Sequence, residues 1–437
     1  MKNKIAFMTT QVLILSACLH TASAQIAMPP RTLSNVDCLA NQQNPQKIIY
    51  GQNGHMFIAS MDLIEGLPTK QYGDKIVAIS HNLEGMGIKL VVVPVAHKGA
   101  IDYAQLDLKN PAQKAFKPLA IRNEIRNLNS YLQKNGVAVV NTLPALDVNA
   151  PAFWKSDWHW KPEAARAVAQ AVARVVNALP AAQEIPQVDF VTTLTGQTGL
   201  IDDSAYLLRR MQQLCGTPMV SRDTTNLYTT SRVSEVGLLD DDLPQIILAG
   251  TSYSEAPWNF DGFLKENLKK DVENVSVVGG GPFAALTNFL ISERFRENKP
   301  KIIIWEWDTS RFRFTPEDDS AWQQLLVSSR TSCESGVDLL TSTVIKLSSG
   351  VALAKPTTEF HDVRLTFSDK TINDFQVIPS SGATASPAIR IIRLNTPNVT
   401  PQFFMALPPS TSLKIVIPEW VKGFDPQGSV VVRQCLP

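Results

Sequence analysis

Short apolar runs alternate with amphipathic segments between residues 75 and 305. Runs such as residues 89–94 are apolar almost throughout, which is typical of strands buried on both faces of a parallel sheet. Segments such as 119–134 and 162–179 have helical spacing, and the second carries proline in its first turn. The other expected strands are 137–141, 245–249, 274–278 and 301–305, and the other expected helices are 260–267 and 287–297. This alternation predicts a three-layer α/β domain with a mostly parallel sheet.

After about residue 340 the pattern changes to short β-type runs separated by Ser, Thr, Pro and Gly clusters, which favour turns. The expected strands are 364–367, 388–394, 402–406, 412–417 and 429–433. Several short strands with frequent turns predict a small β-sandwich domain. We therefore expect one domain over residues 25–340 and a second over 341–437, as the chain is longer than a single core usually serves.

The first residues have the pattern of a secretory signal peptide. Two lysines precede an apolar stretch at 5–19, and an Ala-Ser-Ala triplet follows at 22–24. This order predicts a signal peptide at residues 1–24 and a periplasmic, secreted mature chain. The alternative is lipoprotein processing at Cys18, because the residues just before it resemble a lipoprotein motif.

The mature chain expected from that cleavage contains four cysteines, Cys38, Cys215, Cys333 and Cys435. An even number in an exported protein predicts two disulfides, although four cysteines allow three pairings. The pairing that respects the expected domain boundary joins Cys38 to Cys215 and Cys333 to Cys435. Unpaired buried thiols are the alternative.

Charge and motif content narrow the function. The 41 Lys and Arg residues nearly equal the 40 Asp and Glu residues, which argues against a nucleic-acid binder. No cluster of His, Cys or carboxylates has the spacing of metal ligands, so we expect no metal. The sequence has no glycine-rich nucleotide loop, and we expect no cofactor.

A serine turn follows an expected strand at residues 250–254, with the sequence Gly-Thr-Ser-Tyr-Ser. A serine at the turn from strand to helix presents its hydroxyl above the C-terminal edge of the sheet, where amide groups face a developing oxyanion. Open α/β sheets bind their ligands at this edge. Ser252 is therefore the candidate nucleophile, and the alternative is that Ser252 or Ser254 caps the next helix.

The candidate base lies in the turn before the helix expected at residue 162. His159 can take a proton from a serine hydroxyl, and Asp157, two residues earlier, can fix the histidine tautomer. By itself the segment also fits a structural histidine near a helix start. Together with the serine turn it indicates a Ser-His-Asp triad. After the strand at 89–94, we expect His97 and Lys98 to lie in a surface loop, with a role in the pocket as the alternative.

Three segments resemble one family. The Asp-x-His-Trp turn at 157–160, the Gly-Thr-Ser-x-Ser turn at 250–254 and Ile-Trp-Glu-Trp at 304–307 are similar to the SGNH-hydrolase-like domain of the alginate O-acetylation family, the AlgX and AlgJ type. The Asp/His segment precedes the serine, in the order of that family rather than of ordinary SGNH enzymes. The cysteines and the β-rich C-terminal region resemble the AlgX branch, so the resemblance covers nearly the whole mature chain.

The resemblance implies roles for individual residues. It makes Ser252 the nucleophile, His159 the general base and Asp157 its orienting carboxylate. It places an aromatic residue in the substrate site, where this chain has Trp258 instead of the family's tyrosine. The family's arginine near the glycine-rich segment has no counterpart at 279–282.

Further candidate substrate contacts are Asn259 and Arg311, and the alternative for Arg311 is an ion pair with Asp308 or Glu306. In the expected carbohydrate-binding module the candidate contacts are Arg364 and Arg390, and Arg393, Lys414 and Trp420 are also available. Arginine would bind the carboxylates of a uronate polymer. The alternative is scattered surface charge with Trp420 in the core.

The expected function is that of a periplasmic O-acetyltransferase that acetylates an exopolysaccharide, alginate or alginate-like, through an acetyl-serine intermediate. The expected partners are the polysaccharide, a membrane acetyl-transfer protein that supplies the donor, and other exopolysaccharide export components. The alternatives are a polysaccharide acetylesterase with the same triad, and a non-catalytic polysaccharide-binding scaffold of an export complex.

Overall fold

The architecture is described from a computed structural model. It covers residues 48–199, 207, 223–233, 243–311, 316–330, 337–338, 345–347, 350–355, 359–382, 384–393, 400–421, 423–425 and 428–435. The signal peptide expected at residues 1–24 lies outside them, as do Cys38, Cys215 and Cys333, so processing and disulfide pairing stay predictions. Cys435 is buried and disulfide-bonded. In the described part of the chain, no helix has the length and apolarity to cross a membrane.

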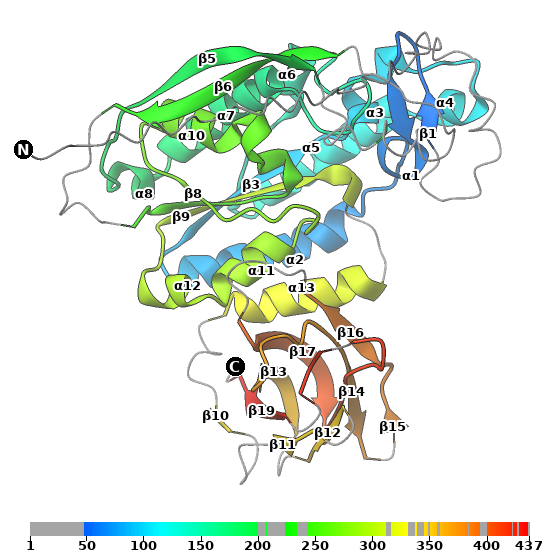
Figure 1. The fold of residues 1–437 in the computed structure, drawn as a ribbon, viewed down its shortest axis with the longest axis vertical. Coiled ribbons are helices and arrows are strands. Elements are labelled where there is room, and N and C mark those ends of the chain that lie inside the picture. Colours follow the sequence, from blue (N-terminus) through cyan, green and yellow to red (C-terminus); the bar gives the residue numbers. More distant parts are fainter. Residues whose placement is uncertain are drawn as a thin grey trace, which may run out of the picture.

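Five parallel strands form the central sheet in the order β4-β3-β9-β7-β8 (Figure 1). Their bounds are β3 (Lys89–Val95), β4 (Ala138–Val139), β7 (Ile246–Ala249), β8 (Glu273–Asn274) and β9 (Ile302–Asp308). The central strands β3, β7 and β9 are buried nearly throughout, which accounts for their unbroken apolar runs. The strands expected at 137–141 and 274–278 are shorter than predicted, because β4 and β8 are edge strands with one pairing neighbour each.

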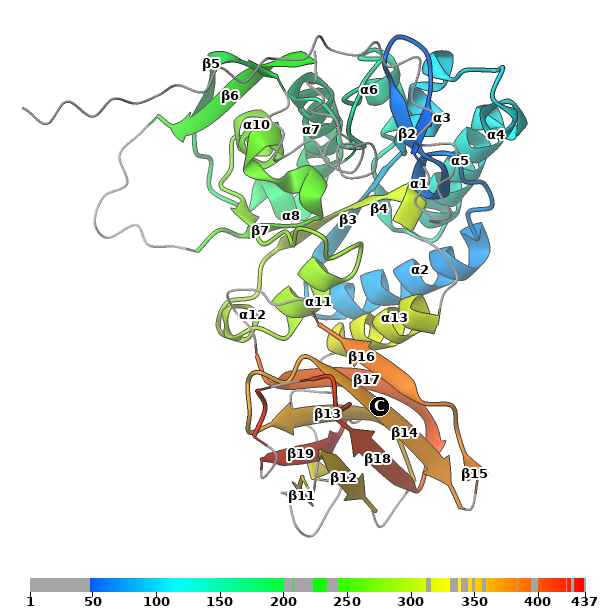
Figure 2. The same cartoon turned by 45° about the vertical axis from the view of Figure 1, so that its right-hand side comes forward.

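Helices cover both faces of this sheet (Figures 1 and 2). On one face lie α7 (Pro162–Asn177) and α10 (Phe260–Leu268), and on the other α2 (Thr69–Gly85), α11 (Ala284–Leu290) and α13 (Pro316–Ser328). Helix α5 (Pro118–Lys134) flanks β4. The helix expected at 287–297 is interrupted, because Ser292 caps a second helix, α12 (Glu293–Glu297), by accepting the Phe295 amide N–H at 3.1 Å.

The remaining elements of this domain surround the sheet. They are β1 (Ile48–Tyr50), β2 (Met56–Ile58), α1 (Ala59–Asp62), α3 (Lys98–Ile101), α4 (Pro111–Ala115), α6 (Leu143–Asp147), α8 (Pro180–Gln183), β5 (Phe190–Gly199) and β6 (Thr224–Arg232). Strands β5 and β6 form an antiparallel ribbon over α10 that the sequence did not predict, because its threonine-rich strands lack a clear apolar alternation.

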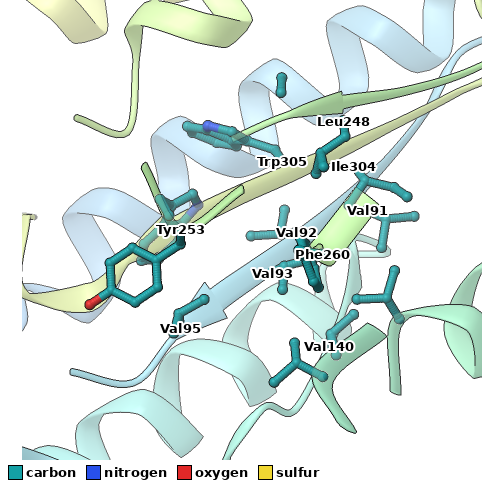
Figure 3. Packing of buried hydrophobic residues seen from close by; sticks show 14 of the residues in the cluster. Val91, Val92, Val93, Val95, Val140, Leu248, Tyr253, Phe260, Ile304 and Trp305 are labelled. Atoms are coloured by element: carbon teal, nitrogen blue, oxygen red, sulfur yellow. The ribbon is translucent and has the colours of Figure 1, made fainter. Parts of the chain in front are cut away.

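The core of the α/β domain gathers side chains from strands far apart in sequence. Figure 3 shows valines of β3 together with Leu248 of β7 and Ile304 and Trp305 of β9. Tyr253 and Phe260, which follow β7 in the chain, belong to the same cluster. The packing of Tyr253 against this core anchors the turn that carries Ser252.

Two antiparallel five-stranded sheets make up the C-terminal sandwich (Figure 2). One is ordered β10-β19-β13-β17 with β11 beside β19, and the other β12-β18-β14-β15 with β16 beside β14. The bounds are β10 (Val337–Asp338), β11 (Ile345–Lys346), β12 (Val351–Ala354), β13 (Phe360–Phe367), β14 (Asp374–Ser381), β15 (Thr384–Ala385), β16 (Ile389–Ile392), β17 (Gln402–Ser410), β18 (Ser412–Val416) and β19 (Ser429–Gln434). Strands β10, β11, β12, β14 and β15 were not predicted, and β10 begins before the boundary expected at residue 341.

The sandwich packs against the helical layer that contains α13 (Figure 1). Val327 of α13 forms an apolar cluster with Ile291 of the α/β domain and with Phe404 and Cys435 of the sandwich. This contact covers the outer face of the sheet that contains β17. It lies on the opposite side of the central sheet from α7 and α10.

Candidate active site

Two turns meet above the end of β7. Ser252 begins the 3-10 helix Ser252–Ser254 directly after the strand, and His159 lies in the loop that leads into α7. Ser252 Oγ and His159 Nε2 are 2.7 Å apart, and His159 Nδ1 and Asp157 Oδ1 are 2.6 Å apart. The structure therefore brings together the three side chains that the sequence singled out, in the relative geometry of a nucleophile, a base and an orienting carboxylate.

Exposure decreases along this chain of hydrogen bonds. Ser252 is partly exposed, His159 is 8% exposed and Asp157 is 0% exposed. The residue that carries the hydroxyl is therefore partly open to solvent, whereas the carboxylate that would stabilise a charged imidazole is shielded from water. Electrostatic interactions are stronger in such a water-poor setting.

The backbone around His159 is folded back on itself. Phe153 and Trp160 form an antiparallel bridge, and the Trp154 amide donates to the His159 carbonyl at 3.1 Å. Asp157 Oδ1 accepts the His159 backbone N–H at 2.9 Å in addition to facing the ring. One carboxylate oxygen thus fixes both the backbone and the imidazole of the candidate base.

Aromatic rings enclose the imidazole of His159. Trp258 stacks on it with ring centres 5.4 Å apart and an interplanar angle of 23°, and the Trp158 and Tyr253 rings lie 5.2 and 5.1 Å away. Trp258 Nε1 donates to the Ser252 carbonyl at 2.9 Å. Because aromatic faces attract cations, these rings favour the imidazolium that forms during proton transfer.

A tyrosine and a tryptophan tie the two turns together. Trp160 Nε1 donates to the Tyr253 carbonyl at 2.9 Å, and the Tyr253 hydroxyl donates to the Trp158 carbonyl at 2.7 Å. Burial keeps the pKa of Tyr253 well above its usual range, so its hydroxyl keeps its proton as a donor.

Glu306 lies beneath the serine turn at the end of β9. Its carboxylate accepts the Thr251 amide N–H and the Ser254 hydroxyl, both at 2.8 Å, and the Thr251 hydroxyl at 3.0 Å. Burial raises the pKa of Glu306 to about 7, although these donors lower it. A β-carbon at Gly250 would come within 2.6 Å of this carboxylate, so the turn needs glycine there.

The turn leaves one amide for a developing oxyanion. The Thr251 N–H is bound by Glu306 and the Tyr253 N–H by the Thr251 hydroxyl, whereas no acceptor among the described residues pairs with the Ser252 N–H. The Gly250 N–H donates to Ser276 Oγ at 2.9 Å, which holds the start of the glycine-rich loop beside the turn. Such an amide donor is what acyl transfer requires.

The other candidate contacts of the α/β domain are placed differently. Trp258 is at the site, but it stacks on His159 and its indole N–H is engaged. Asn259 caps α10 in the left-handed region, with φ 52°, and its amide donates to Thr230 Oγ1 at 3.0 Å, so that side chain is used in packing the β5–β6 ribbon. Arg311 is exposed and makes no ion pair with Asp308 or Glu306 in this structure.

In the sandwich the two candidate arginines lie on different sheets. Arg364 is opposite Phe404 in the β13–β17 register and so shares the face that packs toward α13. Arg390 of β16 is exposed, donates to both oxygens of Asp374 at 3.0 and 2.7 Å, and lies 5.4 Å from the Trp420 ring. Trp420 is 60% exposed, so the alternative in which it belongs to the core is wrong.

The expectation that His97 and Lys98 lie in a surface loop is also wrong, because both are 0% exposed. Sequence reasoning gave no role to Tyr253, considered a pocket role for Lys98 only as an alternative, and considered Glu306 only as an ion-pair partner of Arg311. The sequence did contain a signal for Glu306, because a glutamate inside the buried, apolar strand β9 must be hydrogen-bonded to buried donors. No group of His, Cys, Asp and Glu in the described ranges could hold a metal.

Comparison with known proteins relates this chain to proteins of alginate biosynthesis. The family described as the SGNH hydrolase-like domain of the acetyltransferase AlgX matches residues 48–309, more than half of the chain. The alginate biosynthesis protein AlgX of Pseudomonas fluorescens is 28% identical over 77% of this chain and 71% of that protein. AlgX of Pseudomonas aeruginosa is 32% identical over 60% of this chain and 56% of that protein. The probable alginate O-acetylase AlgJ of Pseudomonas aeruginosa is 26% identical over 52% of this chain and 60% of that protein.

Two solved structures share the fold. The structure of Pseudomonas aeruginosa AlgX matches with a TM-score of 0.73 and 23% identity, over 90% of this chain and 95% of that one. The O-acetyltransferase domain of Pseudomonas putida AlgJ matches with a TM-score of 0.51 and 22% identity, over 64% of this chain and 98% of that domain. The predicted fold class, an SGNH-hydrolase-like α/β domain followed by a β-rich domain, is confirmed.

Proposed function

Because the chain belongs to the family of the SGNH hydrolase-like domain of AlgX, we propose that it is an O-acetyltransferase that acetylates hydroxyls of an exopolysaccharide, alginate or an alginate-like polymer. The observation that carries the proposal is the continuous hydrogen-bonded chain from Asp157 through His159 to Ser252, with distances of 2.6 and 2.7 Å. A scaffold that only binds polymer has no need for this arrangement.

In the first half-reaction Ser252 Oγ attacks the carbonyl carbon of the acetyl donor while His159 Nε2 takes its proton. The Ser252 amide N–H faces the oxyanion of the tetrahedral intermediate. The intermediate collapses to acetyl-Ser252 as the bond to the leaving group breaks, and His159 gives its proton to that group.

In the second half-reaction a sugar hydroxyl replaces the leaving group. His159 takes the hydroxyl proton as the sugar oxygen attacks the acetyl carbonyl, and the new oxyanion meets the same amide. Breakdown of the intermediate releases the O-acetyl sugar and returns the proton to Ser252 Oγ. Trp158, half-buried beside His159, offers the incoming sugar an apolar face and limits access of water.

We place a polymer-binding surface on the sandwich, around Trp420 and Arg390. The exposed indole is held by its Nε1 hydrogen bond to Asp374 at 3.1 Å, and the same carboxylate fixes the guanidinium of Arg390. A flat ring with a fixed cation beside it suits a sugar ring that carries a carboxylate. Lys414, on β18 at the other side of β14 from β16, is exposed and adds positive charge.

In this proposal the protein acts in the periplasm, and the acetyl donor comes from a membrane partner that carries acetyl groups across from the cytoplasm. Exopolysaccharide export components would present the polymer. The charge-balanced composition is consistent with an exported protein that meets the polymer through a local surface rather than through overall charge.

Incubation with p-nitrophenyl acetate, with and without mannuronate oligomers, tests the proposal. We expect mass spectrometry to find acetyl on Ser252 and then on the oligomers, and Ser252→Ala to abolish both. Acetyl released only as acetate in the presence of every acceptor would make the protein an esterase. Oligomer binding without any acetyl-enzyme would make it a scaffold.

A further inference from the structure

Lys98 lies beneath the loop that carries Asp157 and His159. It is the first residue of α3, and its side chain is completely buried. Lysine is rarely buried unless its ammonium group is paired, because removing that charge from water is costly. A fully buried lysine next to a candidate base therefore needs an explanation.

The ammonium group of Lys98 lies within hydrogen-bond distance of four backbone carbonyls, which share its three N–H donors. Nζ donates toward the Trp154 oxygen at 2.6 Å, the Met56 oxygen at 2.7 Å, the Asp157 oxygen at 2.9 Å and the Lys155 oxygen at 3.0 Å. Three of these carbonyls belong to the segment 154–157, immediately before His159. The lysine therefore fixes the peptide groups that aim the Asp157 side chain.

Buried carboxylates hold the amide groups of the same loop. Asp102 accepts the Ala152 N–H at 2.8 Å and the Phe153 N–H at 3.2 Å, and Asp223 accepts the Lys155 N–H. With Lys98 on the carbonyls and these aspartates on the amides, both kinds of backbone group in the loop have charged partners. Hydrogen bonds with one charged partner are roughly twice as strong as neutral ones.

The charges around Lys98 are mostly negative. Burial lowers the pKa of Lys98, whereas Asp62, Asp102, Asp157 and Asp223 raise it. The pKa of the nearby His55 is lowered by burial and by the charge of Lys98. Burial raises the pKa of Asp62 to about 7 and that of Asp102 to about 6, and Lys98 is the main opposing charge for both. Glu255 is a further charged group near His159, and Lys155 and Lys161 add positive charge near His55.

We propose that Lys98 is a positioning residue for acetyl transfer: its four carbonyl contacts set the loop so that Asp157 meets His159 Nδ1, and its positive charge interacts with that carboxylate. This inference rests on the proposed function. Lys98 does not touch the reacting atoms. Loss of its contacts misplaces the base relative to Ser252 Oγ, and small misplacements cost rate rather than binding.

Lys98→Met tests the proposal, since methionine keeps the length and loses the charge and the donors. We expect kcat for acetyl transfer to fall by about a hundredfold or more, with KM changed less than about threefold. The acid limb of the kcat/KM profile should move to higher pH, because removing a positive charge makes protonation of its neighbours easier. A lysine that served folding alone would leave this limb in place.

Lys270→Met is the matched control. Lys270 is also buried and donates to one carbonyl, that of Ile185 at 2.8 Å, away from the triad. It should lower stability without changing the pH profile. A folded Lys98→Met protein with near-wild-type kcat and an unchanged acid limb would overturn the proposal.

Two further variants separate the explanations. In Lys98→Met/Asp62→Asn the cluster keeps its charge balance, and we expect kcat to stay low. Full recovery of kcat would mean that Lys98 only neutralises Asp62, and the proposal would be wrong.

If Lys98→Met does not fold, Lys98→Arg is the replacement variant, because arginine keeps the charge but not the geometry. Its kcat should fall while the acid limb of the pH profile stays in place. A wild-type kcat in that variant also contradicts the proposal. Ser252→Ala, run alongside, tests the proposed function separately, since acetylation that survives in that variant refutes the nucleophile whatever Lys98 does.

Discussion

Asp157→Asn separates the two functions of the buried carboxylate. Asp157 Oδ1 receives two N–H groups of His159, from the backbone at 2.9 Å and from the ring at 2.6 Å. An asparagine that placed its amide nitrogen there would oppose both donors, and the buried backbone N–H cannot turn away. The oxygen should therefore occupy this position, and the ring should keep its proton on Nδ1.

The variant then loses the charge of Asp157 but keeps the orientation of His159. An imidazolium about 4 Å from a carboxylate is stabilised by about 4 kcal/mol at an effective dielectric constant of about 20. Loss of that energy in the transition state corresponds to a rate reduction of about a thousandfold. Asp157→Ala also loses the orientation and leaves a buried N–H unpaired, so we expect about a further tenfold and a loss of stability of about 1–3 kcal/mol.

The rate to measure is the single-turnover acetylation of Ser252 by p-nitrophenyl acetate, followed by quench and mass spectrometry. Nitrogen-15 NMR of His159 reports its tautomer. Asp189→Asn, at an exposed aspartate that pairs with Lys269, is the control and should be neutral. A ring proton that moves to Nε2 would refute the orientation argument, and an Asp157→Asn rate within tenfold of wild type would refute the electrostatic one.

Three further outcomes are expected. Ser252→Ala and His159→Ala should each slow acetyl transfer by several orders of magnitude, and the double variant should be little worse than either; additive losses in kcat would contradict a shared proton path. Burial raises the pKa of Glu306 from 4.5 to about 7, so ionising it costs stability as the pH rises through that window. Relative to Glu306→Gln, the wild type should lose about 2–3 kcal/mol of unfolding free energy, measured with urea, between pH 5 and pH 8, and parallel pH profiles would show that Glu306 is not the cause. Trp420→Ala and Arg390→Ala should weaken polymer binding and leave turnover of p-nitrophenyl acetate unchanged, and equal losses in both assays would argue against a separate polymer surface.

The strands and helices that the sequence predicted well are those with a strong local signal. Strand β3 is a run of valines, and α7 begins at the proline expected in its first turn. The serine turn was also visible, because the Gly-Thr-Ser segment directly follows a buried strand, although by itself the segment also fits a helix cap. The ribbon of β5 and β6 was missed, since its stability depends on packing over α10 rather than on a pattern of its own.

The candidate triad was predicted from residue types and from the resemblance, but the approach of two segments 93 residues apart is a property of the sheet. The serine follows β7, and the loop of His159 is fixed above it by α7 and by the aromatic contacts of Trp160 with Tyr253. No local sequence pattern encodes the approach of Ser252 and His159, because it results from the order of the strands in the sheet.

The sequence by itself determined the fold class, the elements with unbroken periodicity and the three side chains able to form an acyl-transfer site. Tertiary structure decided which charged residues became internal and which candidate contacts faced the site. Lys98 is buried and Trp420 is exposed, the reverse of what their polarity suggests. The physical reason is that the environment of a side chain is set by what packs against it: four carbonyls from segments distant in the sequence can surround a buried ammonium group, whereas the Trp420 indole, beside the Arg390 guanidinium, stays 60% exposed.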